Sequence, residues 1–141
     1  MDARCSFPSC ARKRATLFFA HDSTCRVCQG YARQLTAHLS EMDEVNARLL
    51  IVLQGDPRTA PHWAHEFARD LPVLADADSR VKRAYAQYFR PECADETDVF
   101  TLILDSYTAP RAGSFAPDAG GLIAPSEILA WLNVLDCECA G

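Results

Sequence analysis

The sequence predicts a single α/β domain with a mixed central sheet of four to five strands flanked by helices. Short apolar runs alternate with amphipathic helical patterns along most of the chain, and parallel strands need such helical crossovers. Two late strand patterns follow each other with no helix between them, which is typical of an antiparallel pair. The 141 residues, 49% hydrophobic and 23% charged, suffice for one substantial core.

Each expected strand is an apolar or β-branched run that ends near a turn signal. The first run, ATLFFA, is followed by the polar turn HDST, and the second, RLLIVL, by a glycine, an aspartate and a proline. The run VFTLIL is the strongest strand pattern of the second half and has a hairpin partner just beyond it. The expected strands are residues 15–20, 48–53, 71–75, 99–104 and 112–115.

Each expected helix has apolar side chains at steps of three and four. The first begins at Cys25 and continues to Met42, and the second covers residues 61–69. Asp78 or Ser79 can cap a third helix. Val81, Ala84, Tyr85 and Tyr88 then line its apolar side. The last helix begins near Pro125, ahead of a tail at 136–141. Four large aromatic residues on the apolar sides of the helices are expected in the core: Trp63, Tyr85, Tyr88 and Trp131.

Charge and hydropathy argue against two classes of partner. The formal net charge of -5 opposes nucleic-acid binding, which needs a positive face. The basic run of Arg4, Arg12, Lys13 and Arg14 is expected to be solvated, within an N-terminal arm of residues 1–14. No apolar run approaches the roughly 20 residues that span a bilayer, and residues 1–14 lack a secretory apolar stretch. We therefore expect a cytoplasmic protein with no membrane or nucleic-acid partner.

Cys25 and Cys28 form the predicted reactive centre. Three residues are nearly one helical turn, so both sulfur atoms lie on one face within disulfide reach. The amides and dipole at the helix N-terminus favour a thiolate on Cys25, and Arg26, Thr24 and His21 are further candidates for stabilising it. We expect Cys25 to attack a disulfide and Cys28 to resolve the mixed disulfide.

Other interpretations of this pair stay open. Free cysteine is among the most buried residue types, so both thiols could simply be core residues. A zinc site is a further alternative, but zinc commonly takes four ligands, and the remaining cysteine pairs have unsuitable spacing. We expect no metal and no cofactor.

The other cysteines carry weaker signals. Cys137 and Cys139 are a candidate auxiliary redox pair that could relay electrons to the reactive centre, or they are incidental thiols. Cys5 and Cys10 lie in the N-terminal arm, where we expect no function for them.

Four segments carry a resemblance to a known family: LFFAHDSTCRVCQGYARQL, RLLIVLQGD, LPVLADADSRVKRAYAQYF and VFTLILD. Together they resemble the thioredoxin-like superfamily over residues 15–135. They are most similar to its redoxin branch of alkyl hydroperoxide reductase and thiol-specific antioxidant (peroxiredoxin-like) domains. The resemblance implies a thioredoxin-like fold and a role in antioxidant defence and cell redox homeostasis. It also implies a disulfide-containing protein or a small thiol or peroxide as substrate, with a separate electron donor.

The sequence departs from the patterns of these families at three places. Asp22 stands three residues before Cys25, where peroxiredoxins have threonine or serine, and Asp98 and Val99 stand where they have an arginine. No proline stands just before residue 101, where thioredoxins have one. We therefore predict a thiol-disulfide oxidoreductase. Thiol-dependent peroxide reduction is the alternative, and a non-catalytic redox-sensing or binding module is the third hypothesis.

Overall fold

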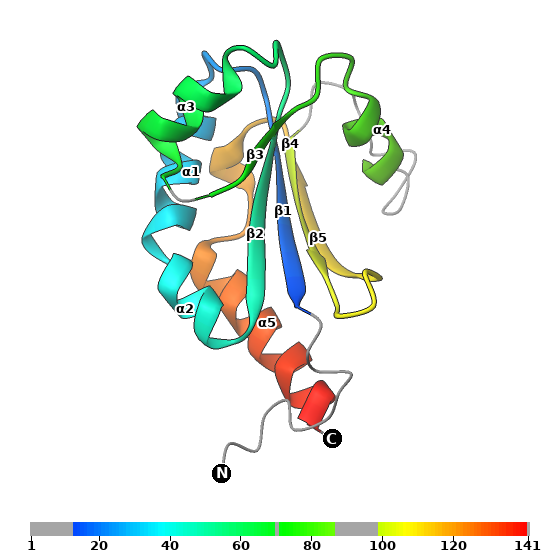
Figure 1. Cartoon of the computed structure of the whole chain (residues 1–141). Helices are drawn as coiled ribbons and strands as arrows, with labels where there is room; N and C mark the ends of the chain where they lie inside the picture. Colours follow the sequence, from blue (N-terminus) through cyan, green and yellow to red (C-terminus); the bar gives the residue numbers. More distant parts are fainter. Residues whose placement is uncertain (1–12, 70, 87–98, 141) are drawn as a thin grey trace.

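The computed structural model describes residues 13–69, 71–86 and 99–140. Five strands form one mixed sheet in the order β3-β2-β1-β4-β5 (Figure 1). Strands β1, β2 and β3 are parallel, β4 is antiparallel to β1, and β5 is antiparallel to β4. The strands are Arg14–Ala20 (β1), Ala47–Leu53 (β2), Val73–Ala75 (β3), Val99–Leu104 (β4) and Pro110–Ala116 (β5). The predicted mixed α/β sheet is confirmed.

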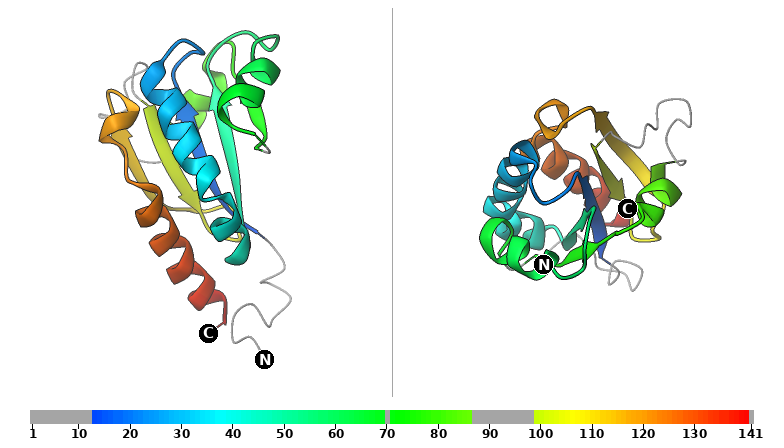
Figure 2. Two further views of the ribbon diagram at one scale, coloured as in Figure 1. Left: turned by 90° about the vertical axis from the view of Figure 1, so that its left-hand side faces the viewer. Right: turned by 90° about the horizontal axis from the view of Figure 1, so that it is seen from above.

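The helices cover the sheet unequally. Helices α1, α2, α3 and α5 lie on one side, and α4 lies on the other (Figure 2). None of the helices in the described ranges is long and apolar enough to cross a membrane. The helices are Arg26–Ala37 (α1), Leu39–Glu44 (α2), Ala60–Phe67 (α3), Arg80–Ala86 (α4) and Pro125–Ala140 (α5), with a 3-10 turn η3 at Ala119–Gly121.

The core follows from the alternation of side chains along the strands. In β1, Phe18 belongs to the larger cluster under α1, α3 and α5, whereas Leu17 and Phe19 belong to the smaller cluster on the opposite face. Trp63 is buried in the larger cluster, as the sequence predicts. Cys28 lies in that same cluster, so the reactive pair borders the main core.

The first predicted helix is divided in two at His38. The Thr36 hydroxyl donates to the Ala32 carbonyl at 2.8 Å, and the His38 amide donates to the Leu35 carbonyl at 3.1 Å. A hydroxyl bonded one turn back commonly bends a helix, and a bond spanning three residues tightens the last turn. The first helix therefore ends at Ala37, and α2 begins at Leu39.

Helix α4 is rotated relative to the prediction. Ser79, one of the two predicted cap residues, stands directly before Arg80, and its carbonyl accepts from the Arg83 amide at 2.9 Å. The side chain that binds the first amides is that of Asp76, whose two carboxylate oxygens accept from the Val81 and Lys82 amides at 3.2 and 2.9 Å. With this start, Lys82 is buried, whereas Val81 and Ala84 are exposed. Tyr85 still packs against the sheet. Tyr88 lies outside the described residues.

The prediction that Trp131 is in the core is wrong, because its side chain is 42% exposed. Helix α5 buries Ile128, Leu132 and Leu135, while Trp131 and Val134 are on its outer side. The helix has apolar residues around most of its circumference, so their spacing could not identify the buried side.

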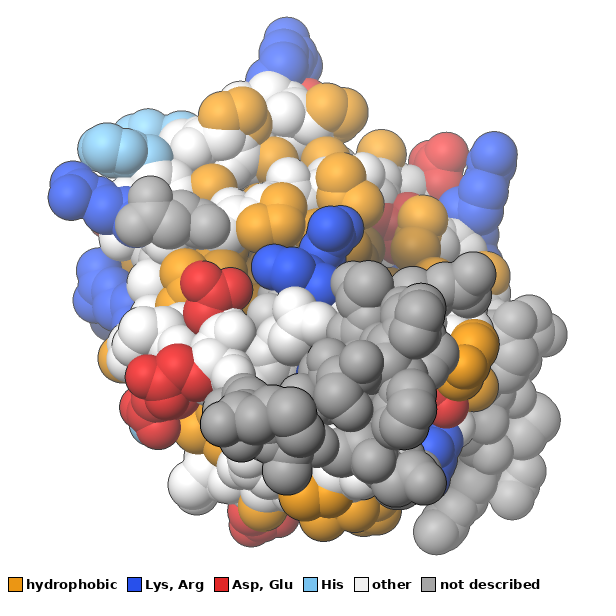
Figure 3. Space-filling view, turned by 60° about the horizontal axis from the view of Figure 1, so that its bottom comes forward, with side chains coloured by type: hydrophobic (Ala, Val, Ile, Leu, Met, Phe, Trp, Pro, Cys, Tyr) orange, Lys and Arg blue, Asp and Glu red, His pale blue; other side chains and the backbone are white. Residues whose placement is uncertain are grey.

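Arg14 is buried, although the sequence indicated a solvated arm. Its side chain is 1% exposed, and Nη2 donates to the Val45 carbonyl at 2.6 Å and to Asp136 Oδ1 at 2.7 Å. Arg14 therefore opens β1, and Asp136, which was assigned to the tail, belongs to α5, which continues through Ala140. The adjacent Lys13 forms only an exposed pair with Asp43, at 3.8 Å. Acidic, basic and hydrophobic side chains are interspersed on this end of the molecule (Figure 3).

Candidate active site

The loop after β1 is held in shape by its own polar groups. Asp22 Oδ1 accepts from the Thr24 amide at 3.0 Å and from the Thr24 hydroxyl at 2.6 Å. These bonds, the hydroxyl first, lower the pKa of Asp22 below its ordinary value. The Gln29 side-chain amide donates to the Ser23 carbonyl at 2.9 Å, which ties the loop to α1. The residues before Cys25 therefore form an ordered turn.

Cys25 is the N-cap residue of α1. Its backbone is extended, and its Sγ accepts from the Cys28 amide at 3.5 Å. This is the thiol position that the sequence predicted, with a helix amide pointing at the sulfur atom. Cys25 is partly exposed, so a substrate can reach it.

Cys28 lies one turn further and is fully buried, with 0% of its surface exposed. Burial, and after it the neighbouring Cys25, raises the pKa of this thiol to about 12. The His21 backbone amide, which donates to Cys28 Sγ at 3.4 Å, acts in the opposite direction. The two cysteines therefore differ in access, as an attacking and a resolving thiol must.

The side chain of His21 completes a compact group. One ring nitrogen of His21 and the sulfur atoms of Cys25 and Cys28 all lie within 4.8 Å of one another. Both cysteines are free thiols in the structure. An imidazole at this range can exchange protons with a thiol directly or through one water.

The other two residues predicted to stabilise the thiolate lie differently. The Thr24 hydroxyl donates to Asp22, so it orders the turn and does not point at sulfur. Arg26 is exposed, at the first position of α1. Of the three predicted stabilising residues, the structure brings His21 to the sulfur atoms.

Lys82 is a site residue that the sequence analysis missed. It is 4% exposed, and its positive charge acts on Cys28 and lowers the pKa of that thiol, against the larger effect of burial. Lys82 comes from α4, on the opposite side of the sheet, so only the folded chain lets its charge act on Cys28. Its one sequence signal is a lysine on a short helix that starts at the edge of the sheet where β1 ends.

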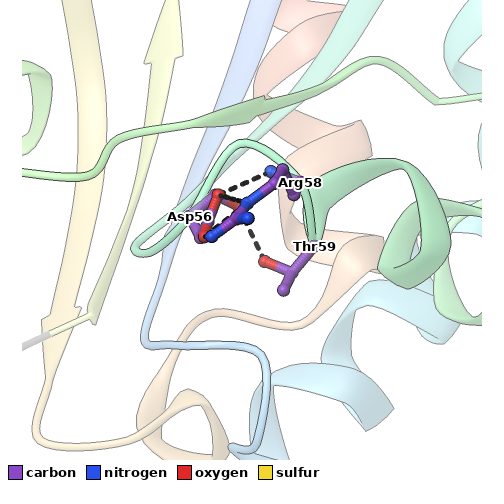
Figure 4. A network of polar contacts seen from close by, with 3 residues as sticks. All are labelled: Asp56, Arg58 and Thr59. Atoms are coloured by element: carbon purple, nitrogen blue, oxygen red, sulfur yellow. Dashed lines mark hydrogen bonds and ion pairs between the residues drawn. The ribbon is translucent and has the colours of Figure 1, made fainter.

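Further hydrogen bonds hold α1 in place and order the loop after β2. The Tyr31 hydroxyl donates to the Ile123 carbonyl at 2.8 Å and lies 3.2 Å from Thr101 Oγ1, which joins α1 to β4 and to the segment before α5. After β2, at the same edge of the sheet, the Asp56 carboxylate accepts from the Arg58 amide and guanidinium, and the Asp56 backbone carbonyl accepts from the Thr59 hydroxyl (Figure 4). Neighbouring loops at this edge are therefore ordered.

The candidate auxiliary pair lies at the other end of the sheet. Cys137 is exposed and follows Asp136, which binds Arg14 at the first residue of β1. Cys25 comes after the last residue of β1, and seven strand residues span about 20 Å. A relay within one molecule would require α5 to leave the sheet. A redox role for Cys137 and Cys139 thus stays a prediction, while Cys5, Cys10 and Cys93 lie outside the described residues.

Similar structures show the same fold. The bacterioferritin comigratory protein of Xanthomonas campestris is 14% identical, with 90% of this chain and 80% of that chain covered and a TM-score of 0.69. AhpC of Enterococcus faecalis is 18% identical, with 86% and 74% covered and a TM-score of 0.69. A secreted disulfide oxidoreductase of Mycobacterium tuberculosis, homologous to E. coli DsbE, is 13% identical, with 86% and 81% covered and a TM-score of 0.61.

These likenesses establish a thioredoxin-like fold, as the sequence predicted. A search of curated protein sequences gives no significant match. The sequence pattern of the AhpC/TSA family, in contrast, matches residues 4–112, which is more than half of the chain and includes the loop, both reactive-centre cysteines and Lys82. The chain therefore belongs to the AhpC/TSA family.

Proposed function

We propose that this thiol redox protein is a thiol-disulfide oxidoreductase in which Cys25 attacks and Cys28 resolves. The observation that carries the proposal is the different environment of the two sulfur atoms. Cys25 Sγ is partly exposed at the start of α1 and accepts a hydrogen bond from a helix amide, whereas Cys28 Sγ is buried one turn away. Helix amides stabilise negative charge at such a position. Only the outer thiol is therefore suited to meet a substrate.

The proposed reaction has two exchanges. The Cys25 thiolate attacks one sulfur of a substrate disulfide, so a mixed disulfide forms and one substrate thiolate leaves. Cys28 then loses its proton and attacks Cys25 Sγ, which releases the second substrate thiolate and forms the Cys25–Cys28 disulfide. His21 is the nearby ring that can accept the Cys28 proton. An external dithiol then restores the reduced pair by the same exchanges in reverse order.

Reduction of insulin disulfides with dithiothreitol as electron donor tests the proposal. Wild-type protein should accelerate the reaction, and Cys25→Ser should abolish the acceleration. Reduced Cys28→Ser, mixed with insulin after dithiothreitol has been removed, should accumulate a mixed disulfide. Cys137→Ser is the matched control, because it removes an exposed thiol at the far end of the sheet. Equal rates for wild type and Cys25→Ser would refute the assignment.

Family membership favours peroxide reduction as the second candidate function. In that reaction the Cys25 thiolate attacks the O–O bond, which leaves a sulfenic acid on Cys25 and expels an alkoxide or hydroxide that takes a proton from the solvent and leaves as alcohol or water. Cys28 then displaces water from the sulfenic acid and forms the same disulfide. Peroxide consumption that depends on Cys25, with no insulin reduction, would select this reaction over the first.

The proposal also includes a cytoplasmic location, which was expected from the sequence, and an electron donor of the dithiol class. Fractionation of cells that produce the full chain tests the location. Recovery in the membrane or extracellular fraction would contradict it.

A further inference from the structure

We propose that reduced Cys25 and Cys28, together with His21, form a three-coordinate binding site for copper(I). Within residues 13–69, 71–86 and 99–140, this is the one group of three histidine, cysteine or acidic side chains whose ligand atoms converge. The inference goes beyond the proposed exchange reaction and does not depend on it, because it needs only the two thiols and the ring.

The distances suit a small metal ion. A metal that binds sulfur at about 2.3 Å and nitrogen at about 2.0 Å holds its ligand atoms roughly 4 Å apart. The three atoms here lie within 4.8 Å of one another, so side-chain shifts of about 1 Å bring them to bonding distance. The loop that carries His21 is ordered by the Asp22–Thr24 bonds, which keeps the ring near the sulfur atoms.

The number and type of ligands favour copper(I) over zinc. Thiolate sulfur is a soft ligand that suits copper(I), and two sulfurs with one nitrogen make a complete trigonal set. Structural zinc sites almost always take four protein ligands, and the described residues supply three. A copper(I) bis-thiolate also carries a net charge of −1, which the positive charge of buried Lys82 favours at Cys28.

Backbone amides and burial support the two sulfur ligands. The His21 backbone amide already donates to Cys28 Sγ, and the Cys28 amide to Cys25 Sγ, so both sulfur ligands have an outer hydrogen bond. Cys28 is closed off from water on the inner side. Copper binding and the Cys25–Cys28 disulfide exclude each other, since oxidation to the disulfide leaves no thiolate to bind the metal.

Titration of the reduced full chain without oxygen, in competition with a coloured copper(I) chelator such as bathocuproine disulfonate, tests the site. One equivalent should bind at His21, Cys25 and Cys28. The variants His21→Ala, Cys25→Ser and Cys28→Ser should each weaken this binding more than about tenfold, since even outer-shell partners of a metal contribute 10- to 100-fold. Matched controls are His62→Ala, an exposed histidine of α3, and Cys137→Ser, and neither should change the affinity.

Two measurements keep the test decisive if a variant folds poorly, which circular dichroism will show. Mass mapping of alkylated wild-type protein should find Cys25 protected by one equivalent of copper(I), and X-ray absorption should find two sulfur atoms and one nitrogen around copper. Wild-type affinity in folded His21→Ala, or alkylation of Cys25 at an unchanged rate with copper bound, would overturn the proposal. A zinc complex that outcompetes equimolar copper(I) would overturn the choice of metal.

Discussion

The strongest prediction concerns the reactivity of Cys28 once Cys25 is removed. With a pKa of about 12, roughly one Cys28 thiol in thirty thousand is ionised at about pH 7.5. An ordinary thiol with a pKa near 8.5 is about 10% ionised at that pH. Because only the thiolate is alkylated, a thiol with a pKa of about 12 reacts about 3,000-fold more slowly than an ordinary thiol. In Cys25→Ser this difference is smaller, because Cys25 is a further cause of the raised pKa, but burial, the largest cause, remains, so Cys28 should still react far more slowly than an ordinary thiol.

The assay is timed reaction with iodoacetamide, followed by mass analysis of the peptides. Cys137 is exposed on the same molecule and serves as the internal reference. In denaturant the two thiols should react at similar rates, which isolates the effect of the fold. If folded Cys25→Ser alkylates Cys28 within tenfold of Cys137, then Cys28 is neither as buried nor as weakly acidic as we argue, and the division of roles between the two cysteines fails.

Two further predictions concern the ends and the loop of the domain. Asp136→Ala should lower the free energy of unfolding by about 3–5 kcal/mol, because the buried Arg14 loses its counter-charge. Asp43→Ala, which breaks the exposed pair with Lys13, should lower it by only about 0–1 kcal/mol. Urea unfolding measures both changes, and equal losses would contradict the stabilising role of the buried pair. Thr24→Ala should raise the pKa of Asp22 toward its ordinary value because it removes the bond with the largest effect. An NMR pH titration that finds this pKa unchanged would contradict the ordered turn.

The sheet could be predicted because its signals are local. Runs such as those of β1, β2 and β4 are apolar on both faces and end at turn signals, which is typical of a strand between two layers. The failures concern residues whose environment depends on distant partners. Arg14 is buried because of Asp136, 122 positions away, and Lys82 is buried because Asp76 fixes the start of α4. The pattern of charges along the sequence predicts neither the burial of Arg14 nor that of Lys82.

The same distinction applies to the site. Cys25, Cys28 and His21 lie within one loop and one helical turn, so spacing alone could place them together. Thr24 shares that turn, but spacing could not show that its hydroxyl would bind Asp22 instead of a sulfur. The charge of Lys82 reaches Cys28 across the sheet, which a linear reading cannot reveal.

The bond between Arg14 and Asp136 has a consequence for the order of folding. A contact that closes 122 positions forms late, because the entropy of closing so long a loop must be overcome first. Until α5 docks, the Arg14 guanidinium must remain hydrated, and the start of β1 around it stays accessible to water. Docking of the last helix is therefore the step that completes the burial of the core at this end. A chain truncated before residue 136 would leave the start of β1 exposed to solvent and prone to aggregation.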